Sequence, residues 1–455
     1  MSTRLAAARL AGAAAVLAAA WQPAQAAAAG SRYLELAADR VVEAAPALLL
    51  ETTLDMPRAA WIYLQSDGVH APVDATQANA YITVDGRLAS NDSIIDWRGS
   101  RAPNQHAFNA IGAVRAGPGR VHIALRARTA GGKALVKAGA NLSILAEPAA
   151  RVVEMRMDEA SPWLDFDTRD TPEGTPIPER GRRALLAAAA GNAAGPVVAM
   201  ASGRSYVSQS PGDAMWGLFL NGRESPLDSA TWSINDLFAP GAEVQAPMFV
   251  QALYPDPPAN SEVQLVASES PYYKPRMAST NAARYRVGRG ARLVTLAGGM
   301  RVFGRGLAPK HDYAANGRHR RYAYTCIGTN GYRPEKCPPL GGDVVIGKGR
   351  ACIPPGHNGV VMFSAKTRIQ GDEADPGGTV SLRLRINGRD VGATSRQTLG
   401  PLPHSVSTRT IGASYLATGK RALPEGCHDV EAVGHATGDF RNISYNVDLP
   451  LLWFD

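Results

Sequence analysis

The chain has 455 residues and a formal net charge of +8, with 45% hydrophobic and 19% charged residues. This basic excess is mild for the length and lacks the clustered density expected of a nucleic-acid-binding protein. No stretch of the chain has the run of about 20 apolar residues that a membrane-spanning helix needs. The length itself predicts about three domains.

Residues 1–26 have the features of a secretory signal peptide. Arg4 and Arg9 give a basic start, residues 10–20 form an apolar core, and Ala24 and Ala26 are the small residues that precede a cleavage site. The alternative is an amphipathic helix of the folded domain, but the segment has no polar face. We therefore predict an exported protein, secreted or periplasmic, whose mature part keeps six of the eight net positive charges.

Three segments share one hairpin signal, in which an alternating apolar strand runs into Asp-Gly-Arg or Asn-Gly-Arg. They end at Arg87, Arg223 and Arg389. Asp-Gly and Asn-Gly favour a two-residue type I′ turn, because both turn residues need positive φ. Each signal has an apolar strand before it and an alternating strand after it. An alternative is that strands of any all-β protein match in this way by chance.

The spacing of these strands and turns predicts an all-β fold of three tandem β-sandwich or jelly-roll-like modules. We place the modules at 31–148, 196–299 and 352–455, with connectors at 149–195 and 300–351.

The first connector holds the best helix pattern of the chain. Pro178 can begin a helix and Gly191 can end it, so we predict one short helix at 177–191.

The same connector also carries paired carboxylates. Asp165 and Asp167 stand beside Trp163 and Phe166, which would place two acids next to sugar-stacking aromatic rings, as a glycan hydrolase requires. The other interpretation, which we favour, is a solvated connector.

The second connector is basic, aromatic and Gly-rich, and it is our candidate binding surface. Arginine and tyrosine contribute strongly to interfaces, and guanidinium groups suit the carboxylate or phosphate of a glycan or lipid head group. The candidate ligand-binding residues are Arg318, Arg320, Arg321, Tyr322 and Tyr324. An ordinary solvated loop is the alternative.

Four cysteines in an exported protein indicate two disulfides. We predict Cys326–Cys337, which closes a short loop, and Cys352–Cys427, although the sequence alone allows other pairings. The chain has no C-x-x-C or paired-histidine spacing that would indicate a zinc site.

The third module contains an acidic turn that could bind calcium. Asp372, Glu373 and Asp375 could supply oxygen ligands, and a simple polar turn is the alternative. We expect no other cofactor.

We predict no catalytic residue, because the standard enzyme motifs are absent from the sequence. His404 and Ser405 are neighbours on an expected strand, so they point to opposite faces and cannot act as base and nucleophile. His122 is expected to be a satisfied strand residue and not a ligand.

Gly-Arg-Val-His-Ile-Ala-Leu-Arg-Ala at 119–127, followed by a Gly-rich turn and Leu-Ser-Ile-Leu at 142–145, resembles the C1q/TNF-like jelly-roll modules of bacterial secreted proteins. The third module is similar at 380–388. The second departs from the pattern at its turns, and the second connector has no counterpart. The resemblance covers roughly half of the chain. It implies modules that often form trimers and bind partners through exposed loops, and it carries over no functional residue.

These observations predict a secreted, non-enzymatic β-sandwich protein that binds an acidic glycan, a cell surface or copies of itself. Two alternatives remain open: a polysaccharide-acting hydrolase or lyase that uses paired carboxylates, and a structural subunit of an extracellular assembly.

Overall fold

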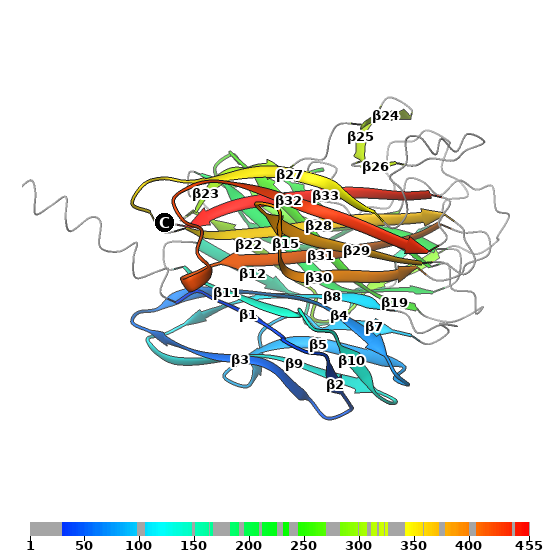
Figure 1. The fold of residues 1–455 in the computed structure, drawn as a ribbon. Coiled ribbons are helices and arrows are strands. Elements are labelled where there is room, and N and C mark those ends of the chain that lie inside the picture. Colours follow the sequence, from blue (N-terminus) through cyan, green and yellow to red (C-terminus); the bar gives the residue numbers. More distant parts are fainter. Residues whose placement is uncertain are drawn as a thin grey trace, which may run out of the picture.

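The computed structural model describes residues 30–97, 105–147, 151–162, 164–166, 183–190, 195–208, 212–224, 231–235, 244–269, 283–298, 300–306, 311–315, 318–322, 324–325, 342–357, 359–372, 378–399, 406–438 and 442–454. The strands of this part of the chain form antiparallel sheets, which face one another as three sandwiches (Figure 1). No helix within the described residues is long and apolar enough to cross a membrane.

The first sandwich is built from the N-terminal third of the chain. One sheet has the order β1 (Arg32–Glu35), β11 (Asn141–Glu147), β4 (Ala60–Pro72), β10 (Ala134–Val136) and β2 (Arg40–Val42), with β8 (His106–Ala116) also pairing with β4. The facing sheet has the order β3 (Ala47–Met56), β9 (Gly119–Ala130), β5 (Gln77–Val84) and β6 (Arg87–Leu88), with β7 (Ser93–Asp96) on β5.

The second sandwich follows the same plan. One sheet has the order β12 (Arg151–Arg156), β22 (Arg292–Ala297), β15 (Val197–Ser208), β21 (Ala283–Val287) and β13 (Leu164–Phe166), with β19 (Val244–Tyr254) on β15. The facing sheet has the order β14 (Arg183–Ala189), β20 (Glu262–Glu269), β16 (Gly212–Leu220) and β17 (Arg223–Glu224), with β18 (Thr231–Asn235) on β16.

The third sandwich ends the chain. One sheet has the order β23 (Met300–Gly306), β33 (Asn442–Phe454), β28 (Val360–Asp372) and β31 (Val406–Ala417), with β26 (Tyr324–Thr325) on β33. The other has the order β27 (Asp343–Ile353), β32 (Gly426–Gly438), β29 (Gly378–Ile386) and β30 (Arg389–Leu399). Strands β24 (His311–Ala315) and β25 (Arg318–Tyr322) form a separate two-stranded sheet, and η4 (Gly419–Arg421) is a single 3₁₀ turn.

The order of strands therefore recurs. The series β1-β11-β4-β8, β12-β22-β15-β19 and β23-β33-β28-β31 correspond, and so do β3-β9-β5-β6, β14-β20-β16-β17 and β27-β32-β29-β30. Each pair of sheets buries its own apolar core, because side chains alternate between the two faces of a strand. On β4, for example, Ile62 and Leu64 fill the first core, whereas Tyr63 faces the other sandwiches.

The all-β prediction is confirmed, but the helix predicted at 177–191 is wrong where the structure describes it. Residues Arg183–Ala189 form strand β14, which pairs with β20. Alanine is the strongest helix former, but intrinsic propensity is readily outweighed by tertiary pairing, and here Ala188 and Ala190 are buried in the core of the second sandwich.

The segments predicted to be connectors also contribute to the sheets. Strands β12, β13 and β14 lie within 149–195 and belong to the second sandwich, and β23 and β27 begin within 300–351 and belong to the third. The sequence pattern indicates the central strands of each sandwich but not the first strands, whose partners lie far along the chain, as Arg183 pairs with Ala267 and Ala189 with Glu262.

The three sandwiches close into a ring. Strand β8 of the first contacts β15 and β22 of the second, β19 of the second contacts β28 and β33 of the third, and β31 of the third contacts β4 and β11 of the first. Strands β8, β19 and β31 also contact one another. The light-blue and cyan strands β4, β8 and β11 of the first sandwich accordingly lie next to the orange strands β30 and β31 of the third in Figure 1. The same kind of head-to-tail contact is therefore made three times within one chain, and the third contact leads back to the first sandwich.

Candidate functional site

The centre of the ring is an apolar core that is distinct from the interior of each sandwich. Tyr63, Met200 and Met362 occupy corresponding places on β4, β15 and β28 and are buried in this shared core. The Tyr63 hydroxyl lies 3.0 Å from the Met200 sulfur, so the first and second sandwiches touch directly. The residues of the shared core that join the sandwiches are thus different from those that form the individual sandwich cores.

A layer of buried polar side chains lies beside this core, with one residue from each sandwich. The Gln65 amide nitrogen donates to the Ser364 hydroxyl at 3.3 Å. That hydroxyl donates to the Gln251 side-chain oxygen at 2.9 Å, and the Gln251 amide nitrogen donates back to the Ser364 carbonyl at 2.8 Å. Hydrogen bonds in such a low-dielectric place are strong when satisfied and costly when broken, so this layer fixes how the sandwiches meet.

Asp67 is the fully buried acid of this junction. Its carboxylate accepts hydrogen bonds from the Asn109 amide, the Ser414 hydroxyl and, at 3.4 Å, the Gln65 amide. Ser414 belongs to the third sandwich, and its carbonyl accepts a 3.1 Å bond from the Asn141 amide of the first. Burial raises the pKa of Asp67 to about 6, although the three hydrogen bonds oppose that rise.

The second and third sandwiches have a cationic residue at the place where the first has Asp67. Asp67 lies four residues after Tyr63, just as Arg204 lies four after Met200 and Lys366 four after Met362. Lys366 is 1% exposed and lies opposite Gly412 of β31. A Cβ atom at Gly412 would come within 2.8 Å of the Asn109 amide nitrogen and 3.2 Å of the Phe249 ring, so a larger residue there would displace side chains of the first and second sandwiches.

The chemistry of this junction is therefore that of assembly. Its hydrogen bonds run between sandwiches and close on buried groups, and they give the three sandwiches one relative position. The described residues contain no group of three or more acidic, histidine or cysteine side chains placed to hold a metal ion.

A second buried titratable group lies next to the junction. His70 of β4 is fully buried, and neither ring nitrogen has a hydrogen-bond partner. Its ring packs on Phe108 at 4.8 Å between centroids, and burial lowers its pKa to about 3. Opposite it, His106 lies 3.1 Å from the Gln397 amide of the third sandwich, measured from Nδ1.

The basic and aromatic residues predicted to bind a ligand lie on strands that do not form this junction. Arg318, Arg320, Arg321 and Tyr322 lie on β25, which pairs only with β24 among the described strands. Tyr324 lies on β26 and pairs with Tyr445 of β33. The side chains of these five residues lie outside the described part of the structure.

The acidic candidates are only partly described. Asp372 is the last residue of β28, whereas Glu373 and Asp375 lie outside the described residues. Asp165 lies on β13 opposite Arg284, and Trp163 and Asp167 lie outside the described residues. His404 and Ser405 also fall there.

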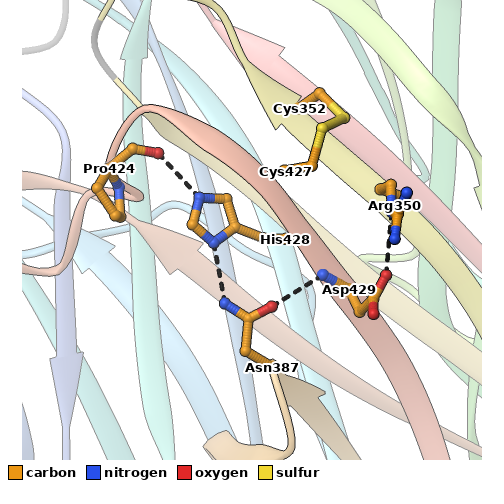
Figure 2. Close-up of a disulfide and its surroundings, with 7 residues drawn as sticks. All are labelled: Arg350, Cys352, Asn387, Pro424, Cys427, His428 and Asp429. Atoms are coloured by element: carbon orange, nitrogen blue, oxygen red, sulfur yellow. Dashed lines mark hydrogen bonds and ion pairs between the residues drawn. A yellow bond between two sulfur atoms is a disulfide. The ribbon is translucent and has the colours of Figure 1, made fainter.

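One predicted disulfide is confirmed. Cys352 of β27 and Cys427 of β32 lie directly opposite each other and are bonded (Figure 2). Cys326 and Cys337 lie outside the described residues. His122 is a satisfied strand residue, as expected, because its Nε2 lies 2.9 Å from the Glu51 carboxylate.

Sequence analysis did not identify Gln65, Asp67 or Lys366. A signal was present, since each interrupts an otherwise apolar strand on the face opposite its own core. Their partners lie as far as 347 residues away, as Ser414 does from Asp67, so the sequence does not show what satisfies them.

Comparison with known proteins gives little more. No protein-family model matches the chain, and no curated protein matches it. Among solved structures, a sugar-binding protein, the EclA C-terminal domain, is 16% identical with a TM-score of 0.17, covering 25% of this chain and 77% of that one. The ANX2 ectodomain from Arabidopsis thaliana is 10% identical with a TM-score of 0.20, covering 68% and 91%. The CBM22 tandem domain from Paenibacillus barcinonensis is 12% identical with a TM-score of 0.17, covering 68% and 98%. Likenesses this slight carry no argument about ligand or activity.

Proposed function

We propose that the mature chain is an exported, non-enzymatic binding protein that recognises an acidic glycan or a glycan-bearing surface. The observation that carries this proposal is the closed ring of three sandwiches. Connecting loops on a rigid scaffold commonly carry binding residues, and the ring holds three sets of such loops in a fixed relation. Simultaneous contacts by linked modules strengthen binding beyond that of any single module.

Two further observations support the parts of this proposal. A disulfide within the third sandwich, together with the predicted signal peptide, is compatible with an oxidising compartment outside the cytoplasm. The net positive charge favours anionic partners.

We also propose that the sandwiches are C1q/TNF-like modules. Support comes from the recurrent strand order and from the ring itself, which would be the trimer of such modules built within one chain.

The test is binding of the purified mature protein to an array of glycans and lipopolysaccharides. We expect acidic glycans to be bound and the binding to weaken as salt screens the charges. A parallel variant with Arg318, Arg320 and Arg321 changed to alanine should lose part of the signal if β25 contributes. The proposal is wrong if no glycan is bound, or if the protein cleaves a polysaccharide and loses that activity when one carboxylate is changed.

A further inference from the structure

The three hairpin turns found in the sequence have the same geometry. The turn pairs Asp85–Gly86, Asn221–Gly222 and Asn387–Gly388 all have positive φ, between 48° and 78°. Each is followed by an arginine that lies opposite the residue before the turn: Arg87 opposite Val84, Arg223 opposite Leu220, and Arg389 opposite Ile386. The predicted two-residue turns are therefore confirmed at all three places.

Each turn is also held to the neighbouring strand by the same two bonds. The Asn387 backbone N–H donates to the Asp429 carbonyl at 2.9 Å, and the Asp429 N–H donates to the Asn387 side-chain oxygen at 2.9 Å, the bond drawn in Figure 2. The same pair of bonds joins Asp85 to His122 and Asn221 to Glu262, at 2.8 to 2.9 Å. These contacts make the three turns rigid platforms.

Turn chemistry explains the Asp, Asn and Gly residues but not the arginines. A type I′ turn requires positive φ at its two central residues and sets no requirement on the residue that follows. Arg87, Arg223 and Arg389 are nevertheless all arginine and all exposed, and none forms an ion pair with another described residue. The carboxylate next to Arg389, that of Asp390, is engaged 3.1 Å from both Arg383 and Arg385.

Corresponding strands carry these arginines, and the sandwiches close into a ring, so the three side chains start from equivalent places around its centre. We propose that Arg87, Arg223 and Arg389 form a trivalent site for a polyanionic polysaccharide, an inference that rests on the proposed function and deepens it. Guanidinium groups bind carboxylate and sulfate in a bidentate manner. One exposed arginine binds weakly, but three on a rigid frame can engage repeating charges of a single polymer together.

The experiment measures binding of the mature protein to immobilised polygalacturonate, with neutral dextran as the blank. The test variant carries Arg87→Gln, Arg223→Gln and Arg389→Gln. The matched control carries Arg58→Gln, Arg289→Gln and Arg396→Gln, which removes one exposed arginine from each sandwich and changes the net charge equally. Thermal melts of both variants check that the fold is retained.

We expect each single turn variant to weaken binding roughly threefold and the triple variant more than about tenfold, because the contacts act together. The control should stay close to the unchanged protein. Equal losses in test and control variants would overturn the trivalent site while leaving glycan binding intact. Absence of binding by the unchanged protein would instead count against the proposed function for this polymer. Binding to phosphatidylglycerol vesicles is measured in parallel. A triple turn variant that loses vesicle binding but still binds polygalacturonate would assign the turns to a membrane surface and overturn the glycan assignment.

Discussion

Asp67 is fully buried yet ionised at neutral pH, since its pKa is raised only to about 6 from an ordinary value of 3.8. The folded state binds the proton more tightly than the unfolded state does. The contribution of Asp67 to the free energy of unfolding is therefore complete below about pH 4 and is lost as the pH rises through 6. His70 acts in the opposite sense, because its lowered pKa makes acidification through 6.5 destabilising. The two slopes oppose each other in the wild-type protein between about pH 4 and 6.

Replacing Asp67 removes its contribution to the pH dependence of stability and leaves that of His70. The Asp67→Asn substitution keeps the shape and removes the buried charge, so we expect it to stabilise the protein at pH 7.5 by up to about 3 kcal/mol and to have little effect at pH 4. Urea midpoints at the two pH values measure this. The exposed Asp55→Asn substitution is the control and should change neither midpoint. A less stable Asp67→Asn variant at pH 7.5 would show that a cation compensates the carboxylate, with Lys366 the buried cation of that layer.

At the scale of elements, β27 is the edge strand of its sheet among the described residues, and side-chain links join it to β32 and β29. The Cys352–Cys427 disulfide spans 75 residues of chain. At the other end of the strand, burial raises the pKa of Asp343, but hydrogen bonds from Arg383, Arg385 and His435 outweigh it and hold that pKa below its usual range. The strand is therefore fixed at both ends, covalently at one and by charge at the other.

Removing the covalent link should loosen the third sandwich. A loop of this length corresponds to about 4 kcal/mol of lost entropy in the unfolded chain, so we expect the double variant Cys352→Ser, Cys427→Ser to unfold first in that sandwich. Hydrogen exchange of β27 amides compared with those of β3, the corresponding strand of the first sandwich, measures the effect. Equal protection of β27 in both proteins would contradict a stabilising role for the disulfide.

How far the sequence predicts these elements depends on the range of the interactions that form them. The turn at Asn387 and Gly388 is local chemistry, and it was predicted from two residues. The sequence of strand β14 predicts a helix instead, because its alanines meet their partners on β20 only in the folded protein. The bond from Gln65 to Ser364 spans 299 residues, and no local pattern predicts it. The fold class was accessible from alternation alone, whereas the junction depends on contacts between sandwiches.

At the scale of the whole molecule, the ring is the feature most open to test. The contact that could join separate copies head to tail is already made three times within one chain, so we expect the mature protein to be a monomer whose mass does not change with concentration.

Met200→Asp would place a charge in the shared core, beside the Tyr63 hydroxyl, but outside the core of its own sandwich. We expect this variant to keep its strand content and to expand in solution scattering, because the sandwiches separate while each stays folded. Met155→Asp, at a methionine of the same sandwich that is 39% exposed, should leave the radius unchanged. A Met200→Asp variant that stays compact would show that the shared core is not needed to hold the sandwiches together. A variant that loses its strands altogether would show that the sandwiches do not fold without the shared core. Either result would contradict a core that joins independently folded sandwiches.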